Sequence, residues 1–345
     1  MPGAKSSSVQ PGRVAAGKVM KLPIELRQAI EEETERPSLQ LLRAASESLS
    51  RGYRASAIPA ARLVSSENDR IAYLATRLPA TYAAARRVAE EILARIPGLE
   101  IESLLDLGAG PGTASWACSE SFEGLRRMTL VERDADFIEL GKRLARHSSK
   151  AALREAQWRS MDLSLSDDWP AHDAVFLTYV LGEVPAPSLS LIVGKGWARA
   201  EKVIAIVEPG TPAGFSRVLA ARQELISLGA AIAAPCPHQT DCPMSGNDWC
   251  HFSARVERTS LHRRAKHGTL PYEDEKYSYV VAARREVDRA PARVIRHPAK
   301  LKGHVRLELC GVRGLIEKTV SRKNKEQYRT ARKSEWGSAW PFSDD

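Results

Sequence analysis

The stretch that decides the fold is DLGAGPGTA, residues 106–114. It overlaps the end of Ser103 to Leu107, an apolar run with the length of a buried strand, and a helical pattern follows it. The glycines Gly108, Gly110 and Gly112 allow a sharp turn and a close approach of the backbone to a ligand. Their G-x-G-x-G spacing differs from the G-x-G-x-x-G of dinucleotide sites, which disfavours a pyrophosphate clamp. The stretch therefore predicts a small nucleoside ligand at the end of a strand.

Three acidic residues lie where such a ligand needs hydrogen-bond acceptors. Asp106 lies at the end of the first strand, just before the glycine turn. Glu132 lies twenty residues after Gly112, at the end of the next apolar run, and is placed to accept hydrogen bonds from two ribose hydroxyls. Asp162 is a candidate acceptor for an adenine amino group. The alternative is a Rossmann-like domain with a different nucleotide site.

Short apolar runs alternate with helical segments in the middle of the chain. Runs at Met128 to Val131, Ala174 to Leu177 and Val203 to Val207 join the first strand as four buried strands of a parallel sheet. Tyr277 to Ala283 predicts a further strand. This alternation indicates a doubly wound α/β domain, whose ligand binds at the carboxyl ends of the strands.

Three of the five cysteines, Cys236, Cys242 and Cys250, fall within fifteen residues. The prolines between them favour an irregular loop in which neighbouring thiols can converge on a metal. Cys310 ends an alternating stretch that a strand can carry to this loop, so it is the best candidate for a fourth ligand. Buried cysteines that bind nothing are the alternative, and core packing is the expected role of the isolated Cys118.

The identity of the metal and of its fourth ligand has competing answers. His238 and His251 compete with Cys310. Four thiolates suit both an iron–sulfur cluster and zinc. Common zinc modules separate paired ligands by about two to four residues. Five and seven residues separate the cysteines here, which favours a cluster, with zinc as the alternative.

The net charge of +9 is concentrated in one segment. From Arg293 to Lys333 there are thirteen Lys or Arg and three acidic residues, a balance of +10, so the rest of the chain is close to neutral. Such a segment beside Tyr328, Trp336 and Trp340 predicts binding to nucleic-acid phosphates with some stacking on bases. The alternative is a solvated face.

Length and composition exclude some classes of protein. At 345 residues the chain is long enough for two or three domains. No apolar run reaches the ~20 residues of a membrane span, and no signal-peptide pattern opens the chain. Five cysteines do not form a disulfide framework, so we expect a reducing compartment and no membrane.

Two resemblances sharpen these expectations. Over roughly Ile101 to Ala283, the glycine turn and the acidic residues resemble those of S-adenosylmethionine-dependent class I methyltransferases. Most of the chain is similar to the methyltransferase-like family associated with the small ribosomal subunit, whose mitochondrial members are assembly factors. The similar stretches are YLATRLPATY at 73–82, the loop at 106–114, VEPGTP at 207–212, the cysteine run, and WGSAWP at 336–341.

The resemblance implies a fold, two cofactors and a partner. The implied fold is α/β, a class I methyltransferase (Rossmann-like) domain with an N-terminal helical region, a cysteine-rich metal loop and a small basic C-terminal β-containing element. S-adenosylmethionine would be held by Asp106, Gly108, Gly110, Gly112, Glu132 and Asp162. A 4Fe-4S cluster would be held by Cys236, Cys242, Cys250 and Cys310. The partner would be small-subunit ribosomal RNA or the small ribosomal subunit itself. The protein would be a monomer, located in the cytoplasm of a bacterium or in the mitochondrial matrix of a eukaryote.

The domain boundaries follow from the same patterns. Helical spacing before residue 101, as in Ala80 to Ile96, sets the N-terminal region apart from the sheet. The expected divisions are a disordered start at 1–20, the helical region at 21–100, the S-adenosylmethionine-binding domain at 101–230 and 275–285, the cysteine-rich loop at 231–274, and the basic element at 286–345.

The catalytic end of the site has no readable signature. Methyltransferases that act on exocyclic nitrogens carry Asn or Asp, then Pro-Pro and an aromatic, after the fourth strand, whereas residues 177–184 read LTYVLGEV. Tyr179 and Glu183 lie where substrate contacts are expected, although core packing and helix capping explain them equally well. Two functions stay open, an RNA methyltransferase and a non-catalytic assembly factor, and no catalytic residue is predicted.

Overall fold

In the computed structural model of the protein, the described residues are 19–34, 42–48, 66–165, 168–266 and 270–343. Most of the start that we expect to be disordered, residues 1–18, lies outside them. Met20, at the end of that stretch, is buried and bridges Val256. Within the described residues, no helix is both long and apolar enough to cross a bilayer.

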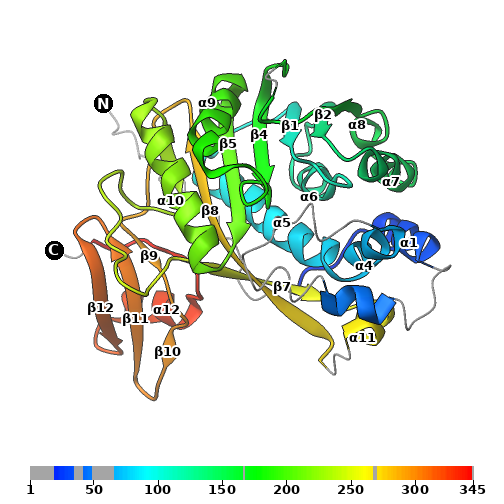
Figure 1. Ribbon diagram of the computed structural model, residues 1–345. Coiled ribbons are helices and arrows are strands. Elements are labelled where there is room, and N and C mark those ends of the chain that lie inside the picture. Colours follow the sequence, from blue (N-terminus) through cyan, green and yellow to red (C-terminus); the bar gives the residue numbers. More distant parts are fainter. Residues whose placement is uncertain (1–18, 35–41, 49–65, 166–167, 267–269, 344–345) are drawn as a thin grey trace, which may run out of the picture.

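An eight-stranded sheet forms the centre of the molecule (Figure 1). Its order is β3-β2-β1-β4-β5-β8-β6, and β7 pairs with β8. The strands from β3 to β5 are parallel, whereas β8 is antiparallel to both β5 and β6. This order is that of class I methyltransferases, so the predicted α/β domain of that type is confirmed. The strands are β1 Ser103–Leu107, β2 Arg127–Glu132, β3 Gln157–Ser160, β4 His172–Thr178, β5 Ala200–Pro209, β6 Ala231–Ala234, β7 Phe252–Glu257 and β8 Tyr272–Ala283.

Helices cover both faces of the sheet because successive strand residues point to opposite sides. Leu104 and Phe176 belong to a core that includes residues of α5, α6, α7 and α8. Leu105 and Leu177 belong to a second core with residues of α9 and α10. The helices are α5 Leu78–Arg95, α6 Thr113–Ser121, α7 Ala135–Ala145, α8 Ala151–Arg154, the short 3-10 helix η1 Ala186–Ser188, α9 Leu189–Arg199 and α10 Pro212–Ser227.

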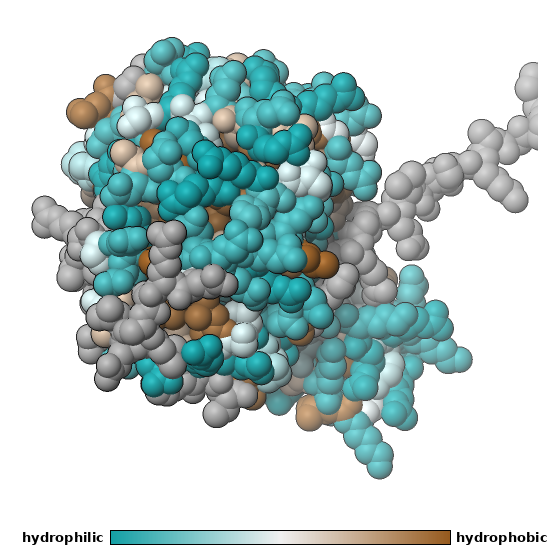
Figure 2. All heavy atoms as spheres, turned by 90° about the vertical axis from the view of Figure 1, so that its right-hand side faces the viewer, coloured by the Kyte–Doolittle hydropathy of each residue, from teal (hydrophilic) through white to brown (hydrophobic). Residues whose placement is uncertain are grey.

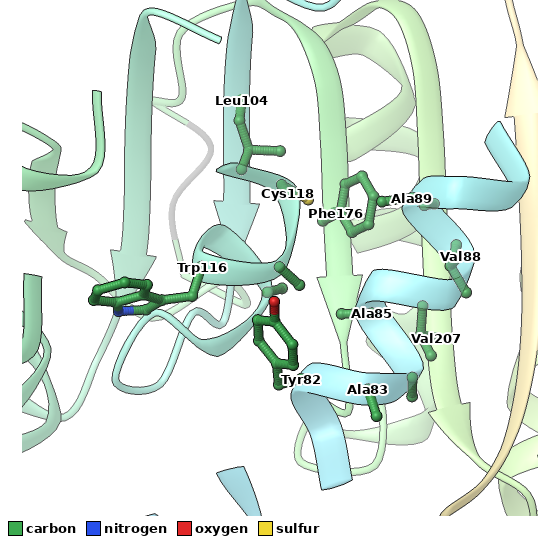
Figure 3. Close-up of a cluster of buried hydrophobic side chains, with 14 of the residues drawn as sticks. Tyr82, Ala83, Ala85, Val88, Ala89, Leu104, Trp116, Cys118, Phe176 and Val207 are labelled. Carbon is green, nitrogen blue, oxygen red and sulfur yellow. The ribbon is translucent and has the colours of Figure 1, made fainter. Parts of the chain in front are cut away.

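Helix α5 is part of this layer, so the predicted helical region is not set apart from the sheet. Pro79 lies in its first turn, where a helix needs no backbone N–H. Ala85 and Ala89 are fully buried, and their small side chains let the helix approach Phe176 (Figure 3). Cys118 is buried in the same core, in line with the expected packing role. Two other N-terminal helices are α1 Ile24–Glu33 and α4 Glu67–Thr76.

The C-terminal residues form a second, five-stranded sheet. Its order is β10-β11-β9-β13, and β12 pairs antiparallel with β11. Alternation along β11 buries Val305, Leu307 and Leu309 in a small core with Trp340 and with Ala331 of α12. The elements are β9 Ala292–Val294, β10 Ala299–Lys300, β11 His304–Gly311, β12 Gly314–Ser321, α12 Lys325–Lys333 and β13 Ala339–Trp340.

The cysteine-rich segment is more structured than the expected loop over 231–274. Strand β6 opens it, and β7 and the helix α11 Ser260–Lys266 occupy its second half, so the irregular part is residues 235–251. Strand β8 already begins at Tyr272, and its first half pairs with β7. Four to six residues with few large apolar side chains gave β6 and β7 too weak a pattern to predict.

The face in Figure 2 is covered mainly by hydrophilic residues, and hydrophobic side chains occupy only small separate areas of it. Isolated apolar side chains are normal on a folded surface. The coloured residues of this face therefore form no extended apolar surface.

Candidate functional site

A cavity of about 360 Å³ lies at the carboxyl ends of β1, β2 and β4. We call it the strand-end cavity. It occupies the place where ligands of doubly wound sheets bind, because the carboxyl ends of parallel strands meet at one edge. Five of the six predicted cofactor residues line it, namely Asp106, Gly108, Gly110, Glu132 and Asp162.

The three glycines of the turn beside this cavity are in the left-handed backbone region. The angle φ is +72° at Gly108, +54° at Gly110 and +82° at Gly112. A Cβ at Gly108 would lie 2.2 Å from Cγ2 of Val180, a distance that real side chains do not tolerate. A Cβ at Gly110 would meet nothing within 4 Å, so this position is open. Gly112 does not line the cavity; a Cβ there would lie 3.2 Å from Leu130.

Asp106 is 1% exposed and carries an unsatisfied acceptor. Its Oδ2 accepts hydrogen bonds from Oγ of Ser115 at 2.7 Å and from N of Ser115 at 3.1 Å. Its Oδ1 is buried and has no partner among the described residues. Burial raises the pKa of the Asp106 carboxyl to about 6, against the lowering effect of Ser115. Because an unpaired buried acceptor costs about 1–3 kcal/mol, a donor on a ligand would stabilise this carboxyl.

Backbone N–H groups hold Glu132 at the end of β2. Its Oε2 accepts from N of Gly110 at 2.8 Å. Its Oε1 accepts from N of Arg133 at 2.8 Å and from N of Asp134 at 2.9 Å. A carboxylate offers about four acceptor sites, so about one remains for a ligand hydroxyl, fewer than the two that we expected.

Arg133, which the sequence did not single out, spans two carboxylates in the cavity. Its Nη1 lies 3.7 Å from Oδ2 of Asp162, and its Nη2 lies 3.5 Å from Oε2 of Glu183. Burial, with the nearby Glu132, raises the pKa of Glu183 to about 8, while Arg133 opposes the rise. Hydrogen bonds from Ser164 lower the pKa of Asp162. The only available signal for Arg133 was its position directly after Glu132.

Tyr179 forms another wall of the cavity and is conformationally unusual. Among the described residues it is the one non-glycine with positive φ, at +58°. Its hydroxyl donates to Oε1 of Glu275 at 2.9 Å, and Nη2 of Arg77 lies 3.3 Å from the same oxygen. Burial, with the Glu275 carboxylate, raises the pKa of Tyr179 well above its usual value, so the phenol stays protonated. A backbone angle of this kind costs about 1–3 kcal/mol and persists only where surrounding contacts impose it.

A second, smaller cavity is lined by all four predicted cysteine ligands, Cys236, Cys242, Cys250 and Cys310. We call it the cysteine cavity. Three of the cysteines come from the loop 235–251 and one from β11, so the C-terminal sheet does bring Cys310 to the loop. Burial raises the pKa of Cys250 well above its usual value, and the other three thiols raise it further. Within the described residues, no group of three or more His, Cys, Asp or Glu side chains is arranged to hold a metal ion.

The two competing histidines are placed differently. His238 lines the cysteine cavity, and its Nε2 lies 3.6 Å from Sγ of Cys310. His251 stacks on Trp249 with ring centroids 5.2 Å apart, and its Nδ1 lies 3.1 Å from the Trp249 carbonyl oxygen. Among the described residues that line the cavity, His238 is present and His251 is not. His238 is therefore the stronger competitor of Cys310.

The basic segment divides into buried and exposed cations. Arg293 is 4% exposed and its Nη1 lies 2.7 Å from Oε1 of Glu91, so it is not a surface charge. Trp336 and Trp340 are buried, which corrects the expectation that they stack on bases. The exposed cations of α12 and of the preceding turn are Arg322, Lys323, Lys325, Arg329, Arg332 and Lys333.

The family model described as mitochondrial small ribosomal subunit Rsm22 matches residues 67–341. The chain belongs to this family. The Rsm22 match covers the strand-end cavity, the cysteine cavity and α12, and the resemblance expected from the sequence is confirmed.

Two relatives of this Rsm22-family chain are mitochondrial ribosome assembly proteins. Human METTL17 is 30% identical over 294 residues, which cover 79% of this chain and 62% of the relative. RSM22 of Saccharomyces cerevisiae is 27% identical over 177 residues, which cover 32% of this chain and 28% of the relative. The chain therefore spans less than two thirds of the length of either relative.

Solved structures with a similar fold are methyltransferases. One is magnesium protoporphyrin IX methyltransferase of Synechocystis PCC 6803 with bound SAM, at a TM-score of 0.40, 13% identity, and coverage of 60% of this chain and 80% of that one. Another is precorrin-6y C5,15-methyltransferase of Geobacter metallireducens, at a TM-score of 0.37, 16% identity, and coverage of 58% and 87%. At these scores the likeness carries no argument about ligands.

Proposed function

We propose that this Rsm22-family chain acts in assembly of the small ribosomal subunit, as a protein that binds S-adenosylmethionine, a 4Fe-4S cluster and ribosomal RNA. The observation that carries the proposal is the family match over residues 67–341, which spans both cavities. The relatives' printed names place them in mitochondria, so the corresponding compartment is the matrix in a eukaryote, or the cytoplasm in a bacterium.

S-adenosylmethionine fits the donor and acceptor groups of the strand-end cavity. Its ammonium or a bound water can donate to the unpartnered Oδ1 of Asp106. Its ribose can donate to Glu132, and its adenine amino group can donate to Asp162, both of which line the cavity. The open space at Gly110 leaves room for the ligand against the backbone. When bound, the cofactor would supply an electrophilic methyl group.

A 4Fe-4S cluster fits the donor set of the cysteine cavity. Four thiols line one partly buried cavity, and each thiolate would bind a different iron. Four thiolates around a single zinc lie only about 3.8 Å apart, given Zn–S bonds of about 2.3 Å. The five and seven residues between the loop cysteines favour the wider arrangement of a cluster over zinc.

A non-catalytic role is the second candidate, and Tyr179 favours it. The residue stands at the expected substrate position, but Glu275 holds its hydroxyl and Arg77 in turn holds Glu275. A phenol with a raised pKa and a fixed hydrogen bond is a poor general base. In this reading the domain binds the cofactor and RNA as a scaffold, without transferring the methyl group.

Two measurements test the proposal and separate its alternatives. Calorimetric titration of the full chain with S-adenosylmethionine should show binding, which Asp106→Asn weakens and the exposed Glu201→Gln does not. Absence of binding to the unmodified chain would remove the cofactor role. Labelled S-adenosylmethionine with immature small subunits should then transfer label to RNA if the chain is an enzyme. Binding without transfer favours the scaffold.

The RNA contact is tested by salt dependence. Replacing Arg329, Arg332 and Lys333 by Gln should lower affinity for small-subunit RNA. Each lost phosphate contact should reduce the slope of log K against log salt by about 0.7–0.9. The exposed Arg126→Gln, in the loop before β2, is the control and should leave the slope unchanged. An unchanged slope in the triple variant would make α12 a solvated face.

A further inference from the structure

Two buried arginines share the cysteine cavity with the four cysteines. Arg222 comes from α10 and Arg293 from β9, and both line the cavity. Their exposed fractions are 3% and 4%. Burying a guanidinium costs several kcal/mol unless negative charge and hydrogen bonds compensate it. The charges around each arginine therefore indicate what the cavity holds.

Arg293 has both a backbone and a carboxylate partner inside the fold. Its Nε donates to the Pro235 carbonyl oxygen at 2.9 Å, next to the first cysteine. Its Nη1 lies 2.7 Å from Oε1 of Glu91, and Nε of Arg95 lies 3.2 Å from the same carboxyl oxygen. The Glu91 carboxylate is therefore shared between two guanidinium groups.

Arg222 has carbonyl partners but no carboxylate among the described residues. Its Nη2 donates to the carbonyl oxygens of His238 at 2.9 Å and Thr240 at 2.8 Å, both in the cysteine loop. Its Nε is buried and has no hydrogen-bond partner within the described part of the chain. Arg222 therefore places a positive charge at the buried cavity with no carboxylate partner in the described part of the chain.

Both arginines line the same cavity as cysteines from separate elements, Cys236 of the loop and Cys310 of β11. Because a guanidinium is always charged and the cavity is small and buried, Arg222 and Arg293 favour negative charge on these sulfur atoms.

We propose that Arg222 and Arg293 are the counter-charges of the iron–sulfur cluster and set its reduction potential, an inference that rests on the proposed cluster. A [4Fe-4S]²⁺ core with four thiolates carries a charge of −2, opposite in sign to the two arginines that line the same cavity. One electron from an external reductant converts the core to [4Fe-4S]⁺ and moves no proton, so the charge of the cluster with its thiolates becomes −3. Removing either positive charge makes that extra electron less favourable and lowers the potential.

The test measures the midpoint potential of the reconstituted full-length protein by redox titration followed by electron paramagnetic resonance. Arg222→Gln should still bind iron. Its midpoint potential should fall by at least about 59 mV, which at a fixed potential changes the ratio of reduced to oxidised cluster tenfold toward the oxidised form. Arg222→Lys keeps the charge and should stay close to the unmodified protein. Equal potentials in the Gln and Lys variants would overturn the inference.

A second variant keeps the test decisive if Arg222→Gln does not fold. Leu219 lies three residues before Arg222 on α10, lines the same cavity and is partly exposed. Leu219→Glu keeps both arginines and should lower the potential, whereas Leu191→Glu adds the same charge at an exposed site of α9 and should not. Unmodified protein without iron would refute the cluster and this inference together. Iron-loaded Leu219→Glu protein with an unchanged potential would refute this inference alone.

Discussion

The strand-end cavity and the cysteine cavity are built in different ways. Backbone geometry shapes the first, through a glycine turn with positive φ and three N–H groups that hold Glu132. Side chains from α10, the loop 235–251, β9 and β11 build the second. Turns at the ends of neighbouring strands therefore place the polar groups of the first cavity, whereas the second requires two sheets to come together. We expect substitutions in the first to act locally and substitutions in the second to loosen several elements at once.

The largest effect should come from the glycine turn. Gly108→Ala combines a left-handed backbone angle with a Cβ 2.2 Å from Val180. The strain and the clash together should lower the free energy of unfolding by about 2–6 kcal/mol. Chemical denaturation measures this. Gly98→Ala is the matched control, since Gly98 also has φ of +72° but a Cβ there would meet nothing within 4 Å. Equal losses in both variants would show that the contact with Val180 does not shape the turn.

The next largest effect is expected in the cysteine cavity. Cys310→Ser should abolish stoichiometric iron binding and lower the stability of the C-terminal sheet by about 2–4 kcal/mol, the scale of a lost cross-link. RNA affinity should fall as well, although no phosphate contact is changed. Iron analysis and hydrogen exchange of β11 measure the two effects, with Cys118→Ala as the control outside the cavity. Full iron loading of the Ser variant would give the fourth position to His238.

A smaller effect is expected where only one ligand contact is lost. Glu132→Ala should weaken S-adenosylmethionine binding by about 1.5–3 kcal/mol, because it removes a charged acceptor of the ribose. It should leave iron content unchanged, since the two cavities are built separately. Calorimetry on the iron-loaded protein measures the affinity, and the exposed Glu155→Ala serves as the control. Loss of iron in the Glu132 variant would contradict the separation of the two cavities.

The smallest effect is a dependence on pH at Asp106. The pKa of Asp106 is about 6 in the folded chain and 3.8 for a solvent-exposed carboxyl. Protonation of Asp106 therefore stabilises the folded, unliganded protein relative to the unfolded chain. Stability of the unliganded protein should therefore fall as the pH rises from 3.8 to about 6. Affinity for S-adenosylmethionine should move the other way and decrease below pH 6, by up to about 1.4 kcal/mol per pH unit. Titrations at several pH values check this, and Asp106→Asn should abolish both trends.

The sequence predicted the site best where a functional residue and the residues that determine its position are neighbours in the chain. The run Ser103 to Leu107, which contains Asp106, is a strand with the predicted bounds, and the glycine turn follows it directly. The acidic residues Glu132 and Asp162 line the cavity because Glu132 ends β2 and Asp162 follows β3 in the same sheet. In all three cases a few neighbouring residues determine where the side chain lies.

The sequence could not reveal contacts made by tertiary packing. Arg293 counted as one of thirteen cations in a basic segment, since composition records charge and not burial. Arg222 gave no signal, because only the folded chain brings α10 to the cysteine loop. Arg77 likewise meets Glu275 only after α4 and β8 have packed into one domain. Local sequence patterns therefore do not predict which charged residues are buried or which partners they contact.

Strand β8 makes contacts at both cavities. Glu275 accepts the Tyr179 hydroxyl at the strand-end cavity, and three residues later Oγ of Ser278 donates to the Cys250 carbonyl oxygen at 2.8 Å. These two residues lie only about 10 Å apart along the strand, because a strand rises about 3.3 Å per residue. If filling one cavity displaces β8 and so changes ligand affinity in the other, the second ligand must change affinity for the first by the same factor. The fraction of the protein that holds both ligands would then depend on the supply of the cofactor and of the cluster together.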